Sequence, residues 1–400
     1  MRILVVNSGS SSIKFSMFAS AAGVSEPGVV YDGELKGIGE AEAKVELHGA
    51  DGAGFGPAGA DPGKGRAAGT SAEAIRGILE IVSGPEMPEV QAVGYRVVHP
   101  GAKLEGHQRI TAEVLRDLEE AVAFAPLHDP AVIDVIRAGM AKFPEVPHYA
   151  CFDTVFHRTM PLEATTYPLP EEVRAEGVRR YGFHGLSCES IVRQMRAAGE
   201  LPKRMVIAHL GSGCSVTAVV DGCSVDTSMG MTPTGGVVMG TRPGDLDPGV
   251  VLYLLRRQEV GAVETMLNHE AGMVGLSGMA NDVKEVRAAA AKGDEKARLA
   301  LKVFTRSVTK VTGGYAWLMG GLDALVFSGG IGEHDPLTRA EVLAGLQGMG
   351  VVVDENLNAA KGSEVRLVSA SESATKIFVV PAQEDLMIAV HVDEMVRTGK

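Results

Sequence analysis

Three short segments rich in glycine and serine are the parts of this sequence best suited to chemistry. They are Ser10–Ser12, Gly211–Ser215 and Gly329–Gly332. Phosphate groups bind where backbone N–H groups cluster, and small side chains let the backbone approach the ligand. The Walker pattern GxxxxGK[ST] does not occur in the chain. The segments therefore predict phosphate binding on turns that do not form a P-loop.

Two arginines and one histidine occupy positions that have both a structural and a functional explanation. Arg96 lies in the apolar run GYRVVHPG, where a buried charge is very costly unless an anion pairs with it. That anion could be a ligand or a carboxylate of the protein. Arg242 lies in the loop sequence MGTRPGDLDPG, where a solvated side chain is the alternative. His184 lies in RRYGFHGLS, where a core histidine is the alternative.

Two acidic residues, Asp153 and Glu384, each follow a predicted strand. Carboxylates at strand ends suit Mg²⁺, which prefers oxygen ligands, but either residue could instead cap a helix or interact with its dipole. For each of these five charged residues taken singly, the structural explanation is favoured.

The elements that must position these residues follow from the pattern of apolar side chains. LVVNSGSSSIKFSMF (4–18) and VIAHLGSGCSVTAVV (206–220) each indicate a strand, a Gly/Ser turn and a return strand. A third strand, 324–328, runs into Gly329. Two equivalent hairpins predict a duplicated α/β domain that faces a central cleft. Further strands are predicted at 29–35, 43–47, 90–98, 148–152, 224–227 and 376–380, and helices at 71–82, 111–124, 130–142, 249–259, 294–319, 337–349 and 385–397.

The composition narrows the class of protein. The chain has 400 residues, which is too long for one ordinary core, so two domains are expected. The net charge of −12 argues against nonspecific nucleic-acid binding. We find no secretory signal and no apolar run near the roughly 20 residues that span a bilayer, so no membrane partner and a cytoplasmic location are predicted. The cysteines lack metal-ligand spacing and are predicted to be buried free thiols: Cys151, Cys188, Cys214 and Cys223.

Taken together, five motifs resemble those of the acetate kinases. They are VNSGSSSIKF (6–15), FDTVFH (152–157), RRYGFHGLS (179–187), MGTRPGDLDPG (239–249) and GGIGEH (329–334). The resemblance covers nearly the whole chain and is weakest at 49–70, a Gly/Ala-rich stretch that predicts a flexible loop. It implies transfer of a phosphoryl group between ATP and a small carboxylate, with ADP as the other nucleotide. It also implies Mg²⁺ as the metal, for which Mn²⁺ could substitute.

The resemblance implies roles for individual residues of this sequence. The catalytic residues would be Arg96, Asp153, His184 and Arg242. The carboxylate substrate would contact Arg96 and an apolar pocket made by Val98, Leu127, Phe183 and Pro233. Asn7 and Glu384 would bind the metal, and Ser10, Ser12 and His128 would support the transition state. The nucleotide would contact Lys14, His209, Leu210, Gly211, Ser212, Gly213, Asp282, Val283, Lys284, Gly329, Gly330, Ile331, Gly332 and Glu333.

These residue types suit the implied reaction. A carboxylate is already a nucleophile, so positioning and neutralisation of charge are what the protein must supply. Two arginines and a histidine can surround a phosphoryl group in flight, which favours direct in-line transfer. The sequence departs from the family pattern at Pro100, Asp129, Ser212, Thr234, Gly235, Lys284 and Gln383.

The implied fold consists of two duplicated actin-like (ribonuclease H-like) α/β domains around a central nucleotide cleft. Residues 1–152 with 385–400 would form one domain and 153–384 the other, and a homodimer is implied. One alternative is a propionate or butyrate kinase on the same fold, although the predicted apolar pocket looks narrow for a longer acid. The other alternative is a non-catalytic nucleotide-binding regulator. Arg96, Arg242, His184 and Glu384 argue against it, because a pure binder needs no groups directed at a transition state.

Overall fold

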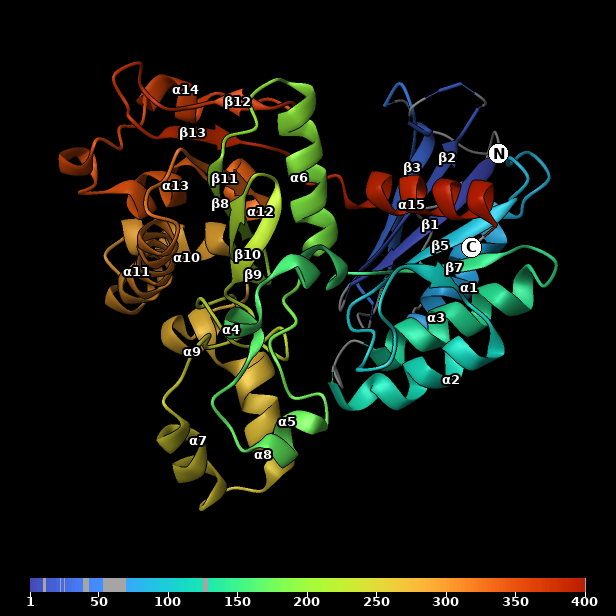
Figure 1. The fold of residues 1–400 in the computed structure, drawn as a ribbon, viewed down its shortest axis with the longest axis horizontal. Coiled ribbons are helices and arrows are strands. Elements are labelled where there is room, and N and C mark those ends of the chain that lie inside the picture. The colour runs from blue at the N-terminus through green and yellow to red at the C-terminus, as the bar shows by residue number, and fades with distance from the viewer. Residues whose placement is uncertain are drawn as a thin grey trace. The chain divides into compact units, whose positions relative to one another are not determined.

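The computed structural model describes residues 1–9, 12–21, 23–24, 26–38, 43–52, 70–124 and 129–399. These residues form two compact units, each built on one β-sheet (Figure 1). Unit 1 comprises Met1–Val155 and Gln383–Lys400, and unit 2 comprises Phe156–Ala382. The predicted α/β class is confirmed, whereas the domain limits at residues 152 and 384 stay a prediction.

Unit 1 contains a seven-stranded sheet in the order β4-β3-β2-β1-β5-β7-β6. The first four strands form an antiparallel meander, and β5 and β7 are added parallel to β1. The strands are β1 (Arg2–Ser8), β2 (Ser12–Ala19), β3 (Gly28–Lys36), β4 (Lys44–Gly49), β5 (Ala92–Val97), β6 (Gln108–Arg109) and β7 (His148–Phe152).

Helices cover both faces of this sheet. Leu4 and Val6 of β1 belong to one core with the apolar faces of the helices α1 (Ser71–Val82) and α3 (Asp129–Lys142). On the opposite face lies α15 (Glu384–Thr398), which packs so closely on β5 that a Cβ at Gly94 would lie 2.7 Å from Ile388. Between β6 and α3 lie α2 (Ala112–Glu120), capped by Thr111, and the short 3₁₀ helix Ala121–Phe124, so the helix predicted at 111–124 is divided in two.

Unit 2 contains a six-stranded sheet in the order β10-β9-β8-β11-β13-β12. Strands β8, β9 and β10 form an antiparallel meander, and β11 and β13 are added parallel to β8. The strands are β8 (Arg204–Leu210), β9 (Cys214–Val220), β10 (Cys223–Thr227), β11 (Ala324–Ser328), β12 (Arg366–Leu367) and β13 (Lys376–Val379). The order matches that of β3-β2-β1-β5-β7, which supports the predicted duplication.

The sheet of unit 2 also has helices on both faces. The helix α6 (Gly185–Ala197) packs its buried residues against β8 and β11, and α11 (Glu295–Leu318) contacts β8 and β9. The remaining helices are α4 (Leu162–Thr165), α5 (Glu171–Ala175), α7 (Pro248–Leu255), α8 (Val260–Thr265), α9 (Gly272–Ser277), α10 (Val283–Ala291), α12 (Gly329–His334), α13 (Pro336–Leu343) and α14 (Glu355–Ala359), with short 3₁₀ or π segments at Val155–Thr159, Met266–Glu270 and Gln347–Met349.

Several expectations from the sequence need correction. The helix predicted at 337–349 ends at Leu343, because the chain turns at Ala344 and Gly345 adopts a positive φ of 82°. Cys223 is exposed, since it follows the turn Asp221-Gly222 at an edge strand, whereas the other three cysteines are buried. Most of the loop predicted at 49–70 lies outside the described residues. Within the part of the chain that the structure describes, no helix is both long and apolar enough to cross a membrane.

Candidate functional site

The predicted phosphate turn of unit 2 joins β8 to β9. Gly211 donates its N–H to the carbonyl of Gly213 (3.0 Å), which closes a tight turn between the two antiparallel strands. Gly329 begins α12 next to this turn, with a φ of +74°. A Cβ at Gly329 would lie 2.7 Å from the Leu210 carbonyl oxygen and 3.1 Å from Nε2 of His209. Two of the predicted glycine-rich segments therefore come together, and only glycine permits the approach.

His184 stands beside the same turn. It precedes α6 with a φ of 56°, a left-handed conformation that is uncommon for a residue with a side chain and often marks a functional position. Its Nδ1 lies 3.0 Å from Oγ of Ser215. The ring stacks on His209 at 4.2 Å between centroids, and His209 Nδ1 lies 2.7 Å from Oγ of Ser187. Hydroxyl groups on both sides thus fix the orientation of the two imidazoles.

Arg242 reaches the turn from a loop that is held by backbone hydrogen bonds. Gly240 donates to the Ser212 carbonyl, and Met239 donates to the carbonyl of Arg242 itself. The guanidinium donates to the Pro233 carbonyl (3.0 Å). A Cβ at Gly213 would lie 3.5 Å from both Nη1 of Arg242 and Nε2 of His184. Burial lowers the pKa of Arg242, so this cation is partly desolvated and suited to an anionic ligand.

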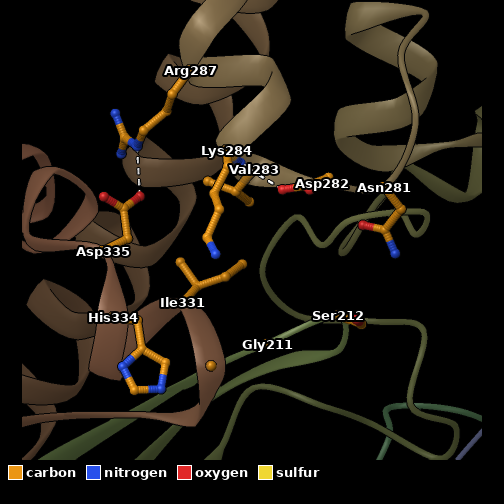
Figure 2. A pocket seen from close by; sticks show the side chains of 11 residues that line it. Gly211, Ser212, Asn281, Asp282, Val283, Lys284, Arg287, Ile331, His334 and Asp335 are labelled. Atoms are coloured by element: carbon orange, nitrogen blue, oxygen red, sulfur yellow. Dashed lines mark hydrogen bonds and ion pairs between the residues drawn. The ribbon is translucent and has the colours of Figure 1, made fainter. Parts of the chain in front are cut away.

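A pocket of about 300 Å³ opens beside the phosphate turn (Figure 2). It contains seven residues that the sequence had assigned to the nucleotide: Gly211, Ser212, Asp282, Val283, Lys284, Gly330 and Ile331. Asp282 caps α10 by accepting the N–H of Lys284 (2.7 Å). Figure 2 shows the Lys284 side chain extending from α10 toward Ile331 of α12. A volume of about 300 Å³ is at the lower end of the range for pockets that bind small molecules.

Four further residues that line the pocket were missed: Asn281, Arg287, His334 and Asp335. Arg287 pairs with Asp335 (2.5 Å) and with Glu341 (2.8 Å), which ties α10 to the segment that leads into α13. The sequence of α10 does not predict these ion pairs, because Asp335 and Glu341 are distant from Arg287 in the sequence.

Glu333 has a different place from the one predicted. It is not among the residues that line the pocket; its Oε1 accepts the N–H groups of Gly329 and Ala382, each at 3.0 Å. Gly329 and Gly332 likewise shape the backbone without lining the pocket. These three residues support the wall that Gly330 and Ile331 form.

Unit 1 gathers a second group of predicted residues around Arg96. Its guanidinium forms a bidentate pair with Asp153, with Nε to Oδ1 at 2.9 Å and Nη2 to Oδ2 at 2.5 Å. Oε2 of Glu384 lies 3.9 Å from Nε, and Oδ1 of Asn7 lies 3.4 Å from Nη1. Burial alone would lower the pKa of Arg96, but the charges of Asp153 and Glu384 outweigh it and raise the pKa above its ordinary value.

Asp385, which the sequence did not single out, completes this group. Asn7 donates through Nδ2 to both Glu384 (3.2 Å) and Asp385 (2.9 Å), and Ser16 donates to Asp385 (2.8 Å). Burial raises the pKa of Asp385, although the hydrogen bonds from Asn7 and Ser16 oppose that shift. Three carboxylates and one amide oxygen beside a single guanidinium are hard oxygen donors of the kind that bind Mg²⁺, so the residues fit a divalent cation.

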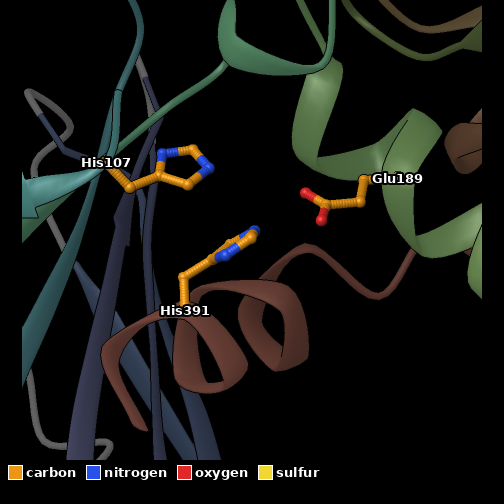
Figure 3. A group of neighbouring side chains, drawn as sticks. All are labelled: His107, Glu189 and His391. Carbon is orange, nitrogen blue, oxygen red and sulfur yellow. The ribbon is translucent and has the colours of Figure 1, made fainter. Parts of the chain in front are cut away.

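A histidine pair lies near the end of β7 in unit 1. Nδ1 of His107 accepts the N–H of Phe152 (3.0 Å), the residue before Asp153. The ring of His107 lies 4.2 Å from that of His391 in α15, between centroids (Figure 3). Glu189, also drawn in Figure 3, belongs to α6 of unit 2. His107 thus contacts the backbone immediately before Asp153.

The residues predicted to contact the substrate's methyl group are divided between the units. Val98 is buried in unit 1, and Phe183 and Pro233 are buried in unit 2. Lys14 is exposed on β2, where its backbone lies opposite Asn7 of β1 in the antiparallel ladder. Ser12 begins the same strand. Ser10, Leu127 and His128 lie outside the described residues. Thr234, one of the departures from the family pattern, donates to Asn268 (3.0 Å).

Comparison with known proteins is decisive. The model of the acetokinase family matches residues 2–390. The chain belongs to the acetokinase family. It is 42% identical over 398 residues to an acetate kinase from Clavibacter michiganensis subsp. michiganensis, with 97% of each chain covered.

Solved structures agree with this membership. A crystal structure of Porphyromonas gingivalis acetate kinase has a TM-score of 0.83 and 33% identity, and 99% of each chain is covered. A propionate kinase from Francisella tularensis subsp. tularensis has a TM-score of 0.87 and 35% identity, covering 98% of this chain and 99% of that one. These acetokinase-family structures confirm the predicted actin-like fold.

Proposed function

We propose that this protein catalyses the reversible transfer of a phosphoryl group between ATP and acetate, which gives ADP and acetyl phosphate. One observation carries the proposal. The nucleotide-type pocket opens at the β8–β9 turn, where Arg242 and His184 also lie. A phosphate chain that follows the turn would bring its terminal group to a cation and an imidazole, which are the groups that stabilise charge in phosphoryl transfer.

The bond changes in this reaction are simple. A carboxylate oxygen of acetate forms a bond to the γ-phosphorus, and the bond from that phosphorus to the β–γ bridging oxygen breaks. ADP leaves with the electron pair, so no proton has to be moved and no general base is required. The catalytic problem is to orient two anions against their repulsion, which fixed arginine side chains can do.

Each group of side chains has a part in the proposal. Arg96 would bind the carboxylate, since Asp153 holds its guanidinium in one orientation. Arg242 and His184 would neutralise the charge on the phosphoryl oxygens, with the His184 ring held by Ser215. Val98, Phe183 and Pro233 would contact the methyl group of acetate. Lys284, Asp282 and Ile331 would contact the nucleoside.

Mg²⁺ is the metal that we propose for this reaction, with Asn7 and Glu384 as its protein contacts. The cation would supply charge neutralisation on the β- and γ-phosphate oxygens. The support in this chain is the excess of carboxylates over cations around Asn7, described above. Asp153 is already paired with Arg96, so its part is to orient the guanidinium.

A propionate kinase remains the second candidate, because a solved propionate kinase is 35% identical to this chain. A coupled assay of ADP formation with formate, acetate, propionate and butyrate tests the choice. An apolar pocket distinguishes one methylene by about 1–3 kcal/mol, so propionate should react, but with a lower kcat/KM than acetate. Equal or higher kcat/KM for propionate would replace the acetate assignment. The Val98→Ala variant should shift the ratio toward propionate.

We also propose that the protein is a homodimer and that α7 takes part in the contact. This apolar helix buries none of its residues within the chain; Leu252 is 54% exposed and Tyr253 is 49% exposed. An exposed apolar surface of this kind is typical of a protein interface. Leu252→Glu should lower the mass measured by light scattering from that of a dimer to that of a monomer, whereas Leu299→Glu on α11 should not.

A cytoplasmic location stays a prediction from the sequence.

A further inference from the structure

His157 is a buried histidine that the proposed reaction does not use. It lies in the motif FDTVFH and is only 1% exposed. Both of its ring nitrogens are engaged within unit 2: Nε2 lies 2.8 Å from the backbone carbonyl of Phe183, and Nδ1 lies 3.0 Å from Oγ of Ser224. The imidazole therefore connects β10 to the residue that immediately precedes His184.

The chemistry of these partners fixes the tautomer. A backbone carbonyl can only accept a hydrogen bond, so Nε2 must carry the proton. In a neutral ring Nδ1 then has a lone pair, and the hydroxyl of Ser224 donates to it. Burial lowers the pKa of His157 to about 4, although the hydrogen bond to the Phe183 carbonyl opposes that shift. The ring is thus neutral, and its orientation defined, at neutral pH.

The backbone that His157 holds is an unusual one. Gly182 has a φ of +78° and His184 a φ of 56°, so the two residues that flank Phe183 both lie in the left-handed region. A Cβ at Gly182 would lie 2.7 Å from Cδ2 of His157, which shows that the imidazole packs directly against this turn. A left-handed residue with a side chain is strained, and it persists where its surroundings hold it.

We propose that His157 is a positioning residue for His184: its Nε2–H anchors the Phe183 carbonyl and thereby keeps the turn in the conformation that presents His184 to the phosphate turn. This inference rests on the proposed function, because it assumes that His184 acts on the phosphoryl group. Without the anchor, the Phe183 peptide could rotate and His184 could leave the left-handed conformation. The imidazole would then lose its contacts with Ser215 and His209.

The test compares two substitutions of the same histidine. His157→Leu removes both hydrogen bonds but keeps the apolar volume, whereas His157→Gln can keep a donor near the position of Nε2. We expect His157→Leu to lower kcat by about tenfold to hundredfold, the range that small misplacements produce, while the KM for ATP changes little. His157→Gln should recover much of that kcat. Equal kcat losses in the two variants, or no loss in either, would overturn the proposal.

His148 provides a matched control. It is also buried, with Nε2 3.0 Å from the Phe143 carbonyl and Nδ1 2.9 Å from the hydroxyl of Tyr95, but it lies in the core of unit 1. His148→Leu should lower the melting temperature and leave kcat of the folded enzyme nearly unchanged. If His157→Leu behaves in the same way as His148→Leu, the role of His157 is only structural.

A measurement on the unmutated protein keeps the proposal testable even if the leucine variant does not fold. Nitrogen-15 NMR of histidine-labelled protein should show a ring that is protonated at Nε2 and neutral from pH 6 to pH 8 and whose signals are lost in His157→Gln, whereas the similar signals of His148 should remain in that variant. If the signals that are lost in His157→Gln belong to a ring protonated at Nδ1, the anchor is contradicted. Failure of the proposed function is distinguishable, because then the unmutated enzyme would not phosphorylate acetate and His184→Ala would have no activity to remove.

Discussion

Arg242 illustrates how the setting of a single side chain changes what can be inferred from it. The Gly/Pro-rich loop around it suggested a solvated arginine as the ordinary explanation. Instead the loop is hydrogen-bonded to the phosphate turn and to the start of α9, and the guanidinium is half-buried beside Gly213. Its desolvation increases the strength with which it attracts an anion.

We expect Arg242→Ala to reduce kcat by about a hundredfold to a thousandfold, as removal of one group that stabilises transition-state charge does. ATP should still bind, because the pocket residues are unchanged. Steady-state kinetics and nucleotide titration check both statements. Arg242→Lys is the control: it keeps the charge but loses the planar fork, so it should recover activity only in part. A loss of less than about threefold, or roughly 0.6 kcal/mol, would contradict the role.

Asp385 supports a different prediction at the residue scale. Its carboxylate accepts from Asn7 and Ser16, and this orients the Asn7 amide so that Oδ1 faces Arg96 while Nδ2 faces the two carboxylates. Residues that orient a metal ligand typically change metal affinity by about 10–100-fold when mutated. Asp385→Asn should therefore weaken Mg²⁺ binding by about tenfold or more, measured by titration with Mn²⁺ followed by electron paramagnetic resonance.

Ser16→Ala is the comparison for this variant. It removes one donor to Asp385 but leaves the hydrogen bond from Asn7, so its effect on the metal should be much smaller. Equal metal affinities for Asp385→Asn and the unmutated protein would mean that Asp385 does not orient Asn7.

At the scale of elements, the sequence predicted best where neighbouring residues determine the structure. Strand β11 begins and ends at the predicted residues, and β8 and β9 form the strand, turn and return strand predicted for 206–220, with β8 starting two residues earlier. Each of these strands is a buried apolar run bounded by glycine or by charged residues. The turn Asp221-Gly222 adopts positive φ at both residues, as such a hairpin requires. Thr70, Thr111 and Asp294 cap α1, α2 and α11, which begin within one residue of the starts of the helices predicted at 71–82, 111–124 and 294–319.

Prediction failed where the determining partners are distant in sequence. The helices α6 and α10 were not predicted, although both contribute to the site. The left-handed His184 at the start of α6 contacts Ser215, and the carbonyl of the preceding Phe183 contacts His157. The pocket wall includes the pair of Arg287 and Asp335. Such long-range contacts leave no periodic pattern, so the resemblance supplied the site residues that the local sequence could not.

Gly329 allows a test of how one element is placed. Gly329→Ala would put a Cβ 2.7 Å from the Leu210 carbonyl oxygen, in addition to the roughly 1–2 kcal/mol cost of left-handed backbone. The start of α12 should therefore shift, and we expect both lower stability and weaker ATP binding. Gly320→Ala is the matched control, because its φ is +69° and open space surrounds it. It should cost stability alone, and an equal loss of ATP affinity in both variants would contradict the steric argument.

At the scale of the whole molecule, the two units share one plan. In each sheet an antiparallel meander is extended by two parallel strands, and helices cover both faces. The first two strands of each unit are also paired up to their adjoining ends, with Ser8 opposite Ile13 in unit 1 and Leu210 opposite Cys214 in unit 2. The repetition explains why two distant stretches of sequence had the same pattern of strand, small residues and return strand.

Buried histidines give the folded protein a defined response to acid. Burial lowers the pKa of His157 from 6.5 to about 4 and also lowers that of His148. The unfolded chain therefore binds protons at these sites at a higher pH than the folded protein does, so stability is complete above pH 6.5 and is lost as the pH falls toward 4. For His157 alone the loss amounts to at most about 3 kcal/mol. We expect the urea midpoint, followed by circular dichroism, to fall through this interval. His157→Gln should flatten that decline. A midpoint that stays constant from pH 6.5 to pH 4.5 would show that neither histidine is held neutral by burial.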